Sequence, residues 1–288
     1  MTQEPTTEPR TYPEGVTSWI DIEPKDIEAA KSFYGGLFGW SFSDATPPET
    51  PFRYVIAQID GKDVAGIGGP REPSPSEPPQ TDLTWNTYVA VDDAQQAADR
   101  VRAAGGRIVQ PPTPAGEGGV SVVCADSSGV EFGMFQANKR LGAQITNTPG
   151  TWNFSDLHTA DAAKSTEFYT QVFGWAVDDL GFATMIRRPG YGDHLAATVD
   201  PGIHERQSGE FVPPGFADAI GWMAPVASGE SPHWHVAFTV ADRDETAAAA
   251  ERLGGTVVAR NDTEWTKDAV IRDPHGALFT ASQFTPPT

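Results

Sequence analysis

Residues 26–40 read DIEAAKSFYGGLFGW, and residues 161–175 read DAAKSTEFYTQVFGW. The two stretches lie 135 residues apart and share an opening aspartate, a Phe-Tyr pair and a closing Phe-Gly-Trp. In both, apolar residues recur at helical spacing, the aspartate is a typical helix N-cap and the glycine is a typical helix stop. The repetition indicates a duplicated structural unit, which constrains the architecture before any single residue is interpreted.

A second pattern also occurs twice, between and after the first pair. It consists of Trp85, Gly105-Gly106, Gly129 and Phe132, which match Trp234, Gly254-Gly255, Gly276 and Phe279. The order along the chain is therefore A, B, A′, B′. Each unit is predicted to form a strand, an aspartate-capped helix and two or three further strands.

The repeat predicts two domains, at residues 14–137 and 151–286, with a linker at residues 138–150. Residues 1–13 are expected to form a loose tail. Unit A′ is predicted to end near residue 201, so residues 201–232 would be a long connector to B′. This connector contains Phe211, Phe216, Trp222 and Met223. It is interpreted equally as a lid or binding loop, or as a loop that packs on the sheet or forms a dimer contact.

Composition argues against several functional classes. The formal net charge is −19 over 288 residues, without a run of Lys and Arg, so neither nucleic acid nor an anionic membrane is an expected partner. Cys124 is the sole cysteine and fits a cytoplasmic location as a buried, inert thiol. No signal peptide and no stretch of 18 apolar residues is recognised.

The repeated phrases resemble the vicinal oxygen chelate superfamily, which includes glyoxalase I, bleomycin-resistance proteins and extradiol dioxygenases. The resemblance rests on Phe-Tyr-x-x-(Leu/Val)-Phe-Gly-Trp and on the turn Asp273-Pro274-His275-Gly276, of which Asp126-Ser127-Ser128-Gly129 is a weaker version. More narrowly, the chain resembles the two-domain actinobacterial glyoxalase-like type, often labelled "hydroxylase". The resemblance implies an α+β fold of four βαβββ modules. These pair into two tandem cup-shaped domains with mixed, largely antiparallel sheets.

The resemblance also implies where a divalent metal would bind, since the family places His and Glu on the first and last strands of its modules. The first-strand position, seven residues before the capping aspartate, falls on Trp19, Asn86, Phe154 and His235. The closing Glu position falls on Gly133 and Thr280. Because only His235 is a good ligand, we expect neither a metal nor another cofactor.

An alternative metal set remains open. Asp156 and His158 lie two residues apart on a predicted strand and therefore share a face. If they meet His235, they form a two-histidine, one-carboxylate group that suits iron, nickel or zinc. In the other reading, Asp156 bonds to backbone and His158 lies on the rim.

Strand alternation predicts which side chains line the cups. The expected ligand pocket consists of Trp19, Asp21, Asn86, Tyr88, Phe154, Asp156, His158 and His235. Aromatic walls with a few polar groups suit a flat aromatic or polyketide-like small molecule. Tyr88 and Asp21 are interpreted either as a structural hydrogen bond or as a general acid–base pair.

Three functions remain open at this level. The first is a metal-independent glyoxalase-like protein that binds, and in one version modifies, a small aromatic metabolite. The second is a metal-dependent lyase or dioxygenase with the Asp156, His158 and His235 set. The third is a structural or partner-binding protein with filled cups. Four modules in one chain permit either a monomer or a homodimer.

Overall fold

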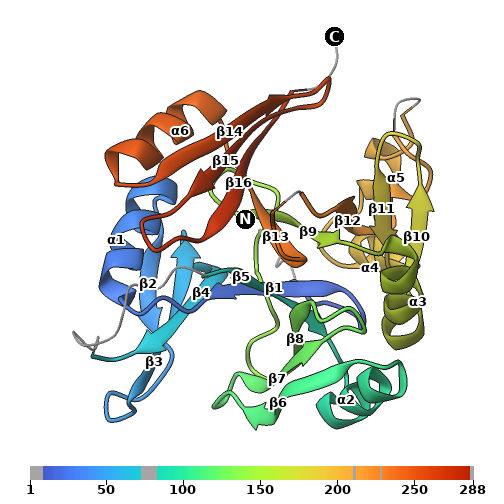
Figure 1. Cartoon of the computed structure of the whole chain (residues 1–288), viewed down its shortest axis with the longest axis horizontal. Coiled ribbons are helices and arrows are strands. Elements are labelled where there is room, and N and C mark those ends of the chain that lie inside the picture. The colour runs from blue at the N-terminus through green and yellow to red at the C-terminus, as the bar shows by residue number, and fades with distance from the viewer. Residues whose placement is uncertain (1–8, 73–82, 210–211, 228, 286–288) are drawn as a thin grey trace, which may run out of the picture. The chain divides into compact units, whose positions relative to one another are not determined.

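The computed structural model describes residues 9–72, 83–209, 212–227 and 229–285 (Figure 1). These residues form sixteen strands in two eight-stranded sheets, six α-helices and one short 3-10 helix. The predicted α+β class of four modules in tandem is confirmed. None of the described helices is long and apolar enough to cross a membrane.

Modules A and B build the first sheet, with strand order β2-β3-β4-β1-β5-β8-β7-β6. In each module the last three strands are antiparallel neighbours, and the first strand pairs in parallel with the last. Module A consists of β1 (Thr17–Ile22), α1 (Ile27–Phe38), β2 (Ser41–Asp44), β3 (Phe52–Ile59) and β4 (Lys62–Pro70). Module B consists of β5 (Trp85–Ala90), α2 (Ala94–Ala103), β6 (Arg107–Pro114), β7 (Gly119–Ala125) and β8 (Glu131–Ala137).

Modules A′ and B′ build the second sheet in the equivalent order, β10-β11-β12-β9-β13-β16-β15-β14. Module A′ contains β9 (Trp152–Thr159), α3 (Ala162–Phe173), β10 (Ala176–Asp179), β11 (Thr184–Arg187), α4 (Tyr191–Ala197), α5 (Ile203–Arg206), the 3-10 helix η1 (Phe216–Asp218) and β12 (Ala219–Pro225). Module B′ contains β13 (His233–Thr239), α6 (Arg243–Arg252), β14 (Thr256–Asp262), β15 (Thr266–Arg272) and β16 (Leu278–Phe284).

The helix signals in the sequence act as predicted. The carboxylates of Asp26 and Asp161 each accept a backbone N–H three residues later, at 3.0 Å, so both cap their helices. Asp93, of the two candidates, caps α2. Gly39 and Gly174 end α1 and α3 with φ of 72° and 70°, a left-handed conformation that favours glycine.

The interpretation of residues 201–232 as one connector is wrong. Residues Ala219–Pro225 form β12, the last strand of module A′, and the inserted α4, α5 and η1 precede it. Trp222 and Met223 are therefore strand residues rather than loop residues, while Phe211 lies outside the described part of the chain. The short strand was hidden because proline and glycine surround its apolar residues.

The predicted loose tail, residues 1–13, is ordered in its last five residues. Tyr12 donates its hydroxyl to the Ala143 carbonyl at 2.6 Å, and Arg10 donates to the Tyr191 hydroxyl at 2.9 Å. Residues 9–13 are thus anchored and not a loose tail. Residues 1–8 and 73–82 lie outside the described residues.

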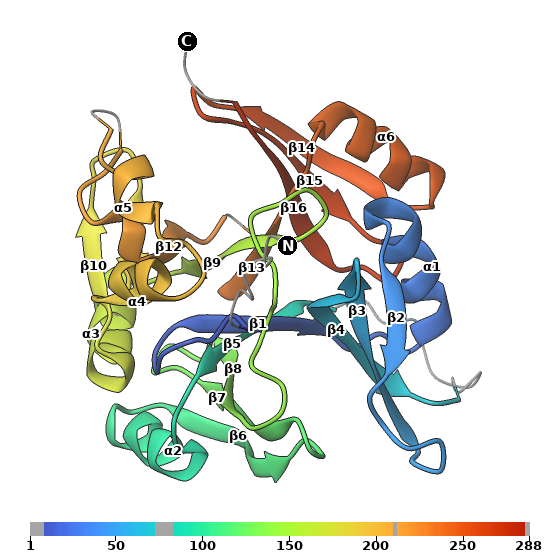
Figure 2. The same ribbon diagram turned by 180° about the vertical axis from the view of Figure 1, so that it is seen from behind.

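Spatial proximity divides the chain into two compact units. Each unit combines most of one module from the first half of the chain with most of one module from the second half. Figures 1 and 2 both place α1 of module A beside α6 of module B′, and these helices are in contact. The domain limits 14–137 and 151–286 follow the sheets and remain a prediction. One unit contains the chain up to Ser18, Tyr88–Gln144 and Leu157–His233; the other contains Trp19–Thr87, Ile145–Asp156 and the chain from Trp234 onward.

The two repeated sequence phrases meet inside these units. The buried Tyr34 hydroxyl donates to Asp273 Oδ2 at 2.7 Å and accepts from Trp85 Nε1 at 3.2 Å. Asp126 and Tyr169 are the matching pair in the other unit. Burial raises the pKa of Asp126, and a hydrogen bond from Tyr169 is among the interactions that partly oppose this rise. The repeated tyrosine and aspartate therefore stabilise the fold.

Candidate functional site

Three predicted pocket residues of module A and the start of module B form one polar cluster. Trp19 Nε1 donates to the Tyr54 hydroxyl at 2.9 Å, and that hydroxyl donates to Asp21 Oδ2 at 2.8 Å. Asn86 Nδ2 donates to Asp21 Oδ1 at 2.8 Å. The Asp21 carboxylate is only 3% exposed, so these bonds satisfy a charge that burial would otherwise destabilise.

Tyr54, the centre of this cluster, was missed from the sequence. Its ring lies on Gly66 of β4, where an added Cβ would be 1.9 Å from the Tyr54 hydroxyl oxygen. Gly68 makes the same kind of room for Phe52 and the Tyr54 ring. Alternating glycines opposite an aromatic strand were the sequence signal for this packing.

Tyr88 belongs to the other compact unit, and its ring packs on Gly133. An added Cβ at Gly133 would be 2.1 Å from Tyr88 Cδ1, and Tyr88 is buried. Gly133 stands at one of the two positions where the family has a glutamate. Here the glycine leaves room for the Tyr88 ring. The proton-transfer role of Tyr88 stays a prediction.

On the second sheet, the histidine at the family's ligand position has a defined partner. His235 is buried, and its Nε2 lies 2.8 Å from Thr280 Oγ1. These residues stand where the resemblance implies histidine and glutamate. A hydroxyl thus replaces the carboxylate beside this imidazole. Phe154 and Asp156 are half-buried on β9.

A different set of residues could hold a metal ion among the described residues. His158, Glu230 and His233 each offer one ligand atom, and these atoms lie within 4.8 Å of one another. His158 is near the end of β9, and His233 is the first residue of β13. The Val226 N–H donates to the Thr159 carbonyl at 3.0 Å, which brings the connector before β13 to the end of β9.

Each histidine of this group is influenced by its neighbours. His233 Nδ1 donates to the Ser231 carbonyl at 2.9 Å, because a carbonyl oxygen can only accept, and this bond fixes the orientation of the ring. Burial lowers the pKa of His158, and His233 lowers it further, while Glu230 acts in the opposite direction. These effects favour the neutral form of the His158 imidazole, which is the form that binds a metal.

The spacing of the group is compatible with one ion. Two ligands bound about 2.1 Å from the same metal lie about 3 to 4 Å apart. Glu230 is exposed and His158 and His233 are half-buried, so modest side-chain rotations would bring the three atoms to that spacing. Two imidazoles with one carboxylate suit divalent iron and related ions.

Two family models match the chain. The Glyoxalase/Bleomycin resistance protein/Dioxygenase superfamily matches residues 18–134, and the Glyoxalase-like domain matches residues 154–282. "Putative glyoxylase CFP32" from Mycobacterium tuberculosis (strain CDC 1551 / Oshkosh) is 33% identical over 96% of this chain and 97% of its own length. "Anthracycline biosynthesis protein DnrV" from Streptomyces peucetius is 30% identical over 92% of each chain.

A solved structure supports the same fold. The Mn(II)-bound glyoxalase from Novosphingobium aromaticivorans superposes with a TM-score of 0.58 and 15% identity, covering 94% of this chain and 82% of that one. At this identity the likeness concerns the fold alone. This solved structure, which shares the fold, contains bound Mn(II).

The expectation of no metal and no cofactor is therefore wrong. It rested on the family's strand positions, whereas Glu230 and His233 lie on and just after the connector between β12 and β13. Of the alternative set, His158 belongs to the group, while Asp156 and His235 are not members of it. The signal that was missed is a glutamate three residues before a histidine at the start of a strand.

Proposed function

The chain belongs to the glyoxalase, bleomycin resistance protein and dioxygenase superfamily, and we propose that it acts on a small oxygen-bearing aromatic molecule with a divalent metal held by His158, Glu230 and His233. The observation that carries the proposal is the approach of these three ligand atoms to within 4.8 Å. When bound, such an ion supplies a Lewis acid that polarises an oxygen of the ligand.

The protein's own part is to hold the two imidazoles in position. The Ser231 carbonyl accepts from His233 Nδ1 at 2.9 Å, which fixes the ring and directs Nε2 away from that bond. The ring centroids of His158 and His233 lie 4.8 Å apart with an interplanar angle of 56°, so the two rings are in tilted contact. Glu230 contributes the negative charge that a divalent ion requires.

An aromatic pair near the same strand supports an aromatic ligand. The ring centroids of Trp222 on β12 and Phe216 of η1 lie 6.0 Å apart, with an interplanar angle of 39°. β12 is the neighbour of β9, the strand that carries His158. A flat ligand would stack on such rings. The similarity to a relative named for anthracycline biosynthesis is consistent with a polyketide-like compound.

Metal content tests the first half of the proposal. Protein loaded with Fe(II), Ni(II) or Zn(II) and then desalted should retain close to one ion per chain by mass spectrometry. His233→Ala and His158→Ala should each bind at least about tenfold more weakly. His204→Ala is the matched control, because His204 also lies beside a carboxylate, Asp193, at 3.0 Å but stands outside the group. Equal retention in all variants, or none in the unaltered protein, would contradict the proposal.

Ligand binding tests the second half. Alizarin, a flat aromatic with two adjacent hydroxyls, should quench the tryptophan fluorescence of the metal-loaded protein. Trp222→Ala should weaken alizarin binding by about tenfold while metal content stays unchanged. Trp265→Ala is the control, since Trp265 stacks on Phe284 at 6.3 Å elsewhere in the chain. Unchanged affinity in Trp222→Ala would argue against this aromatic platform.

A further inference from the structure

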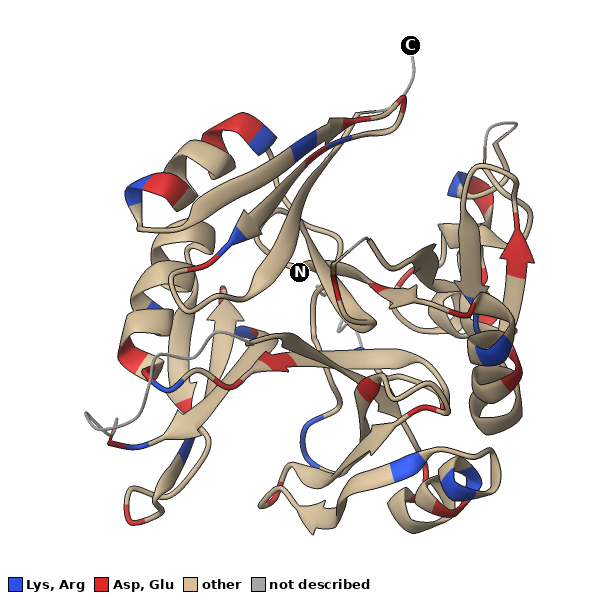
Figure 3. Cartoon of the chain, viewed as in Figure 1, with Lys and Arg blue, Asp and Glu red and all other residues tan. Residues whose placement is uncertain are grey.

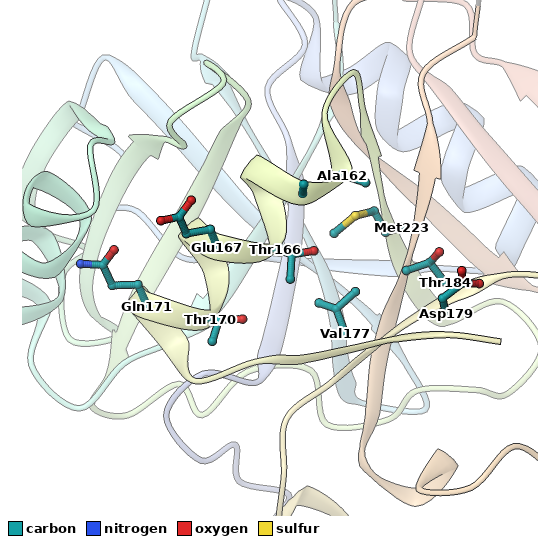
Figure 4. Close-up of a pocket in the computed structure, with 10 residues that line it drawn as sticks. Ala162, Thr166, Glu167, Thr170, Gln171, Val177, Asp179, Thr184 and Met223 are labelled. Atoms are coloured by element: carbon teal, nitrogen blue, oxygen red, sulfur yellow. The ribbon is translucent and has the colours of Figure 1, made fainter. Parts of the chain in front are cut away.

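A surface groove of about 720 Å³ lies between α3 and the strands β10, β11 and β12. Figure 4 shows Thr166 and Thr170 of α3 facing Val177, with Met223, Thr184 and Asp179 on the strand side. Apolar atoms form most of its surface, and two exposed acidic residues, Glu167 and Asp179, are among those that line it. The residues lining it are Ala162, Ala163, Thr166, Glu167, Thr170, Gln171, Val177, Asp179, Thr184 and Met223.

The corresponding place in module A is filled by the chain itself. Alignment of the two helix stretches matches Lys31 with Thr166 and Phe42 with Val177. The Lys31 ammonium lies 5.8 Å from the centroid of the Phe42 ring and 2.9 Å from Glu28 Oε1. The Phe42 ring also covers Gly35, where an added Cβ would be 3.2 Å from it.

A second cation of module A is lost in the copy. Arg53 Nε donates to Asp44 Oδ1 at 2.6 Å, and Arg53 also pairs with Glu28. The strand registers match Asp44 with Asp179 and Val55 with Thr184. Counted back two residues along the sequence, Arg53 corresponds to Phe182, which lies in the bend before β11. Phe182 is 76% exposed.

Module A′ has therefore kept the acid but lost both cations and the aromatic ring. Within the described residues, neither Asp179 nor Glu167 forms an ion pair. Figure 3 marks the end of β10, which carries Asp179, as acidic. The groove thus combines an apolar wall with negative charge that module A neutralises through Lys31 and Arg53.

We propose that this groove binds a small amphipathic amine, with its ammonium at Asp179 and its apolar body against Val177 and Met223. The ammonium of the ligand would take the place of the Lys31 ammonium in module A, and its apolar body would take the place of the Phe42 ring. The net charge of −19 favours the approach of a cation. Because the groove is open and Asp179 is exposed, solvent screens the charge, and affinity on the order of millimolar is expected. The site is separate from the proposed metal group.

The probe is 2-phenylethylamine, compared with neutral 2-phenylethanol and anionic phenylacetate. Amide shifts in a two-dimensional NMR titration should cluster at Thr166, Thr170, Val177 and Asp179. The amine should bind about threefold or more tightly than the alcohol, with the acid weakest, and the difference should shrink in high salt. Equal shifts with the alcohol would overturn the role of charge.

Two variants test the groove independently of metal binding. Thr166→Lys combined with Val177→Phe restores the side chains of module A and should abolish the shifts. Asp179→Asn should weaken amine binding about threefold, whereas Asp193→Asn, an exposed acid on α4, should not. Unchanged binding in Asp179→Asn would sink the proposal, even if the double variant failed to fold. Metal content should be the same in all of these proteins.

Discussion

Modules A and A′ share a first strand, a capped helix and three further strands, but they differ in the side chains that lie between their last two strands. In module A, Tyr54 of β3 lies over Gly66 of β4. In module A′ the strand registers place Trp222 at the position of Gly66, and Ala183, the residue just before β11, corresponds in sequence to Tyr54. The large side chain therefore comes from the other strand. Duplication has kept the residues that cap and end the helices and changed the side chains between these two strands.

The two modules also differ in how their last two strands are joined. Module A uses the hairpin turn Asp60-Gly61, with φ of 50° and 74°. Module A′ inserts α4, α5 and η1 between β11 and β12, and η1 brings Phe216 beside Trp222. The module with the insertion also leads into Glu230 and His233, so candidate chemistry gathers in one half of a duplicated chain.

The largest expected effect comes from filling the space that Tyr54 needs. Gly66→Ala places a methyl group 1.9 Å from the Tyr54 hydroxyl oxygen, so the ring must leave Asp21 and Trp19. The free energy of unfolding should fall by about 3 kcal/mol, as for overpacked cores. Urea unfolding measures this.

A double-mutant cycle isolates the cause. In a Tyr54→Ala background, Gly66→Ala should cost less than about 1 kcal/mol, because the clash is gone. If Gly66→Ala lowers the free energy of unfolding equally in both backgrounds, the glycine is required by backbone strain and not by the Tyr54 ring. The contrast between the two modules would then need another basis.

A smaller effect is expected from the shared tyrosine. Tyr34→Phe leaves Asp273 Oδ2 buried without the hydroxyl that donates to it at 2.7 Å. The free energy of unfolding should fall by about 2 kcal/mol. Tyr169→Phe, the matching change near Asp126, should cost a similar amount by the same urea assay. Strongly unequal values would show that the compact units do not rely equally on this motif.

The smallest effect concerns the cations that only module A retains. Hydrogen bonds from Lys31 and Arg53 lower the pKa of Glu28, and those from Arg53 lower the pKa of Asp44, below their ordinary values. The resulting stability is present above those ordinary values, about pH 4, and is lost as the pH falls through the lowered ones. Both acids are largely exposed, so Arg53→Gln should cost less than about 1 kcal/mol at pH 7.

Urea unfolding at pH 7 and at pH 3 checks this sign. The difference in free energy of unfolding between Arg53→Gln and the unaltered protein should be smaller at pH 3 than at pH 7. Lys139→Gln, which breaks a more exposed pair with Glu117, is the control and should have almost no effect at either pH. A gap that widens in acid would contradict the assignment.

The sequence by itself determined the modules, because their signals are local. Helical spacing after Asp26 and Asp161, the stops at Gly39 and Gly174, and the Asp60-Gly61 turn all act over a few residues. Each therefore reports its own conformation wherever it occurs. The duplicated phrases then gave the order of modules and the family resemblance.

Only the tertiary structure decided which side chains meet. Tyr54 reaches Asp21 because Gly66 makes room on a neighbouring strand, and His158 meets Glu230 and His233 because a connector bonds to the end of β9. Strand alternation assigns a residue to a face, but it carries no information about which distant loop or strand lies opposite. Those approaches are set by the packing of the whole fold.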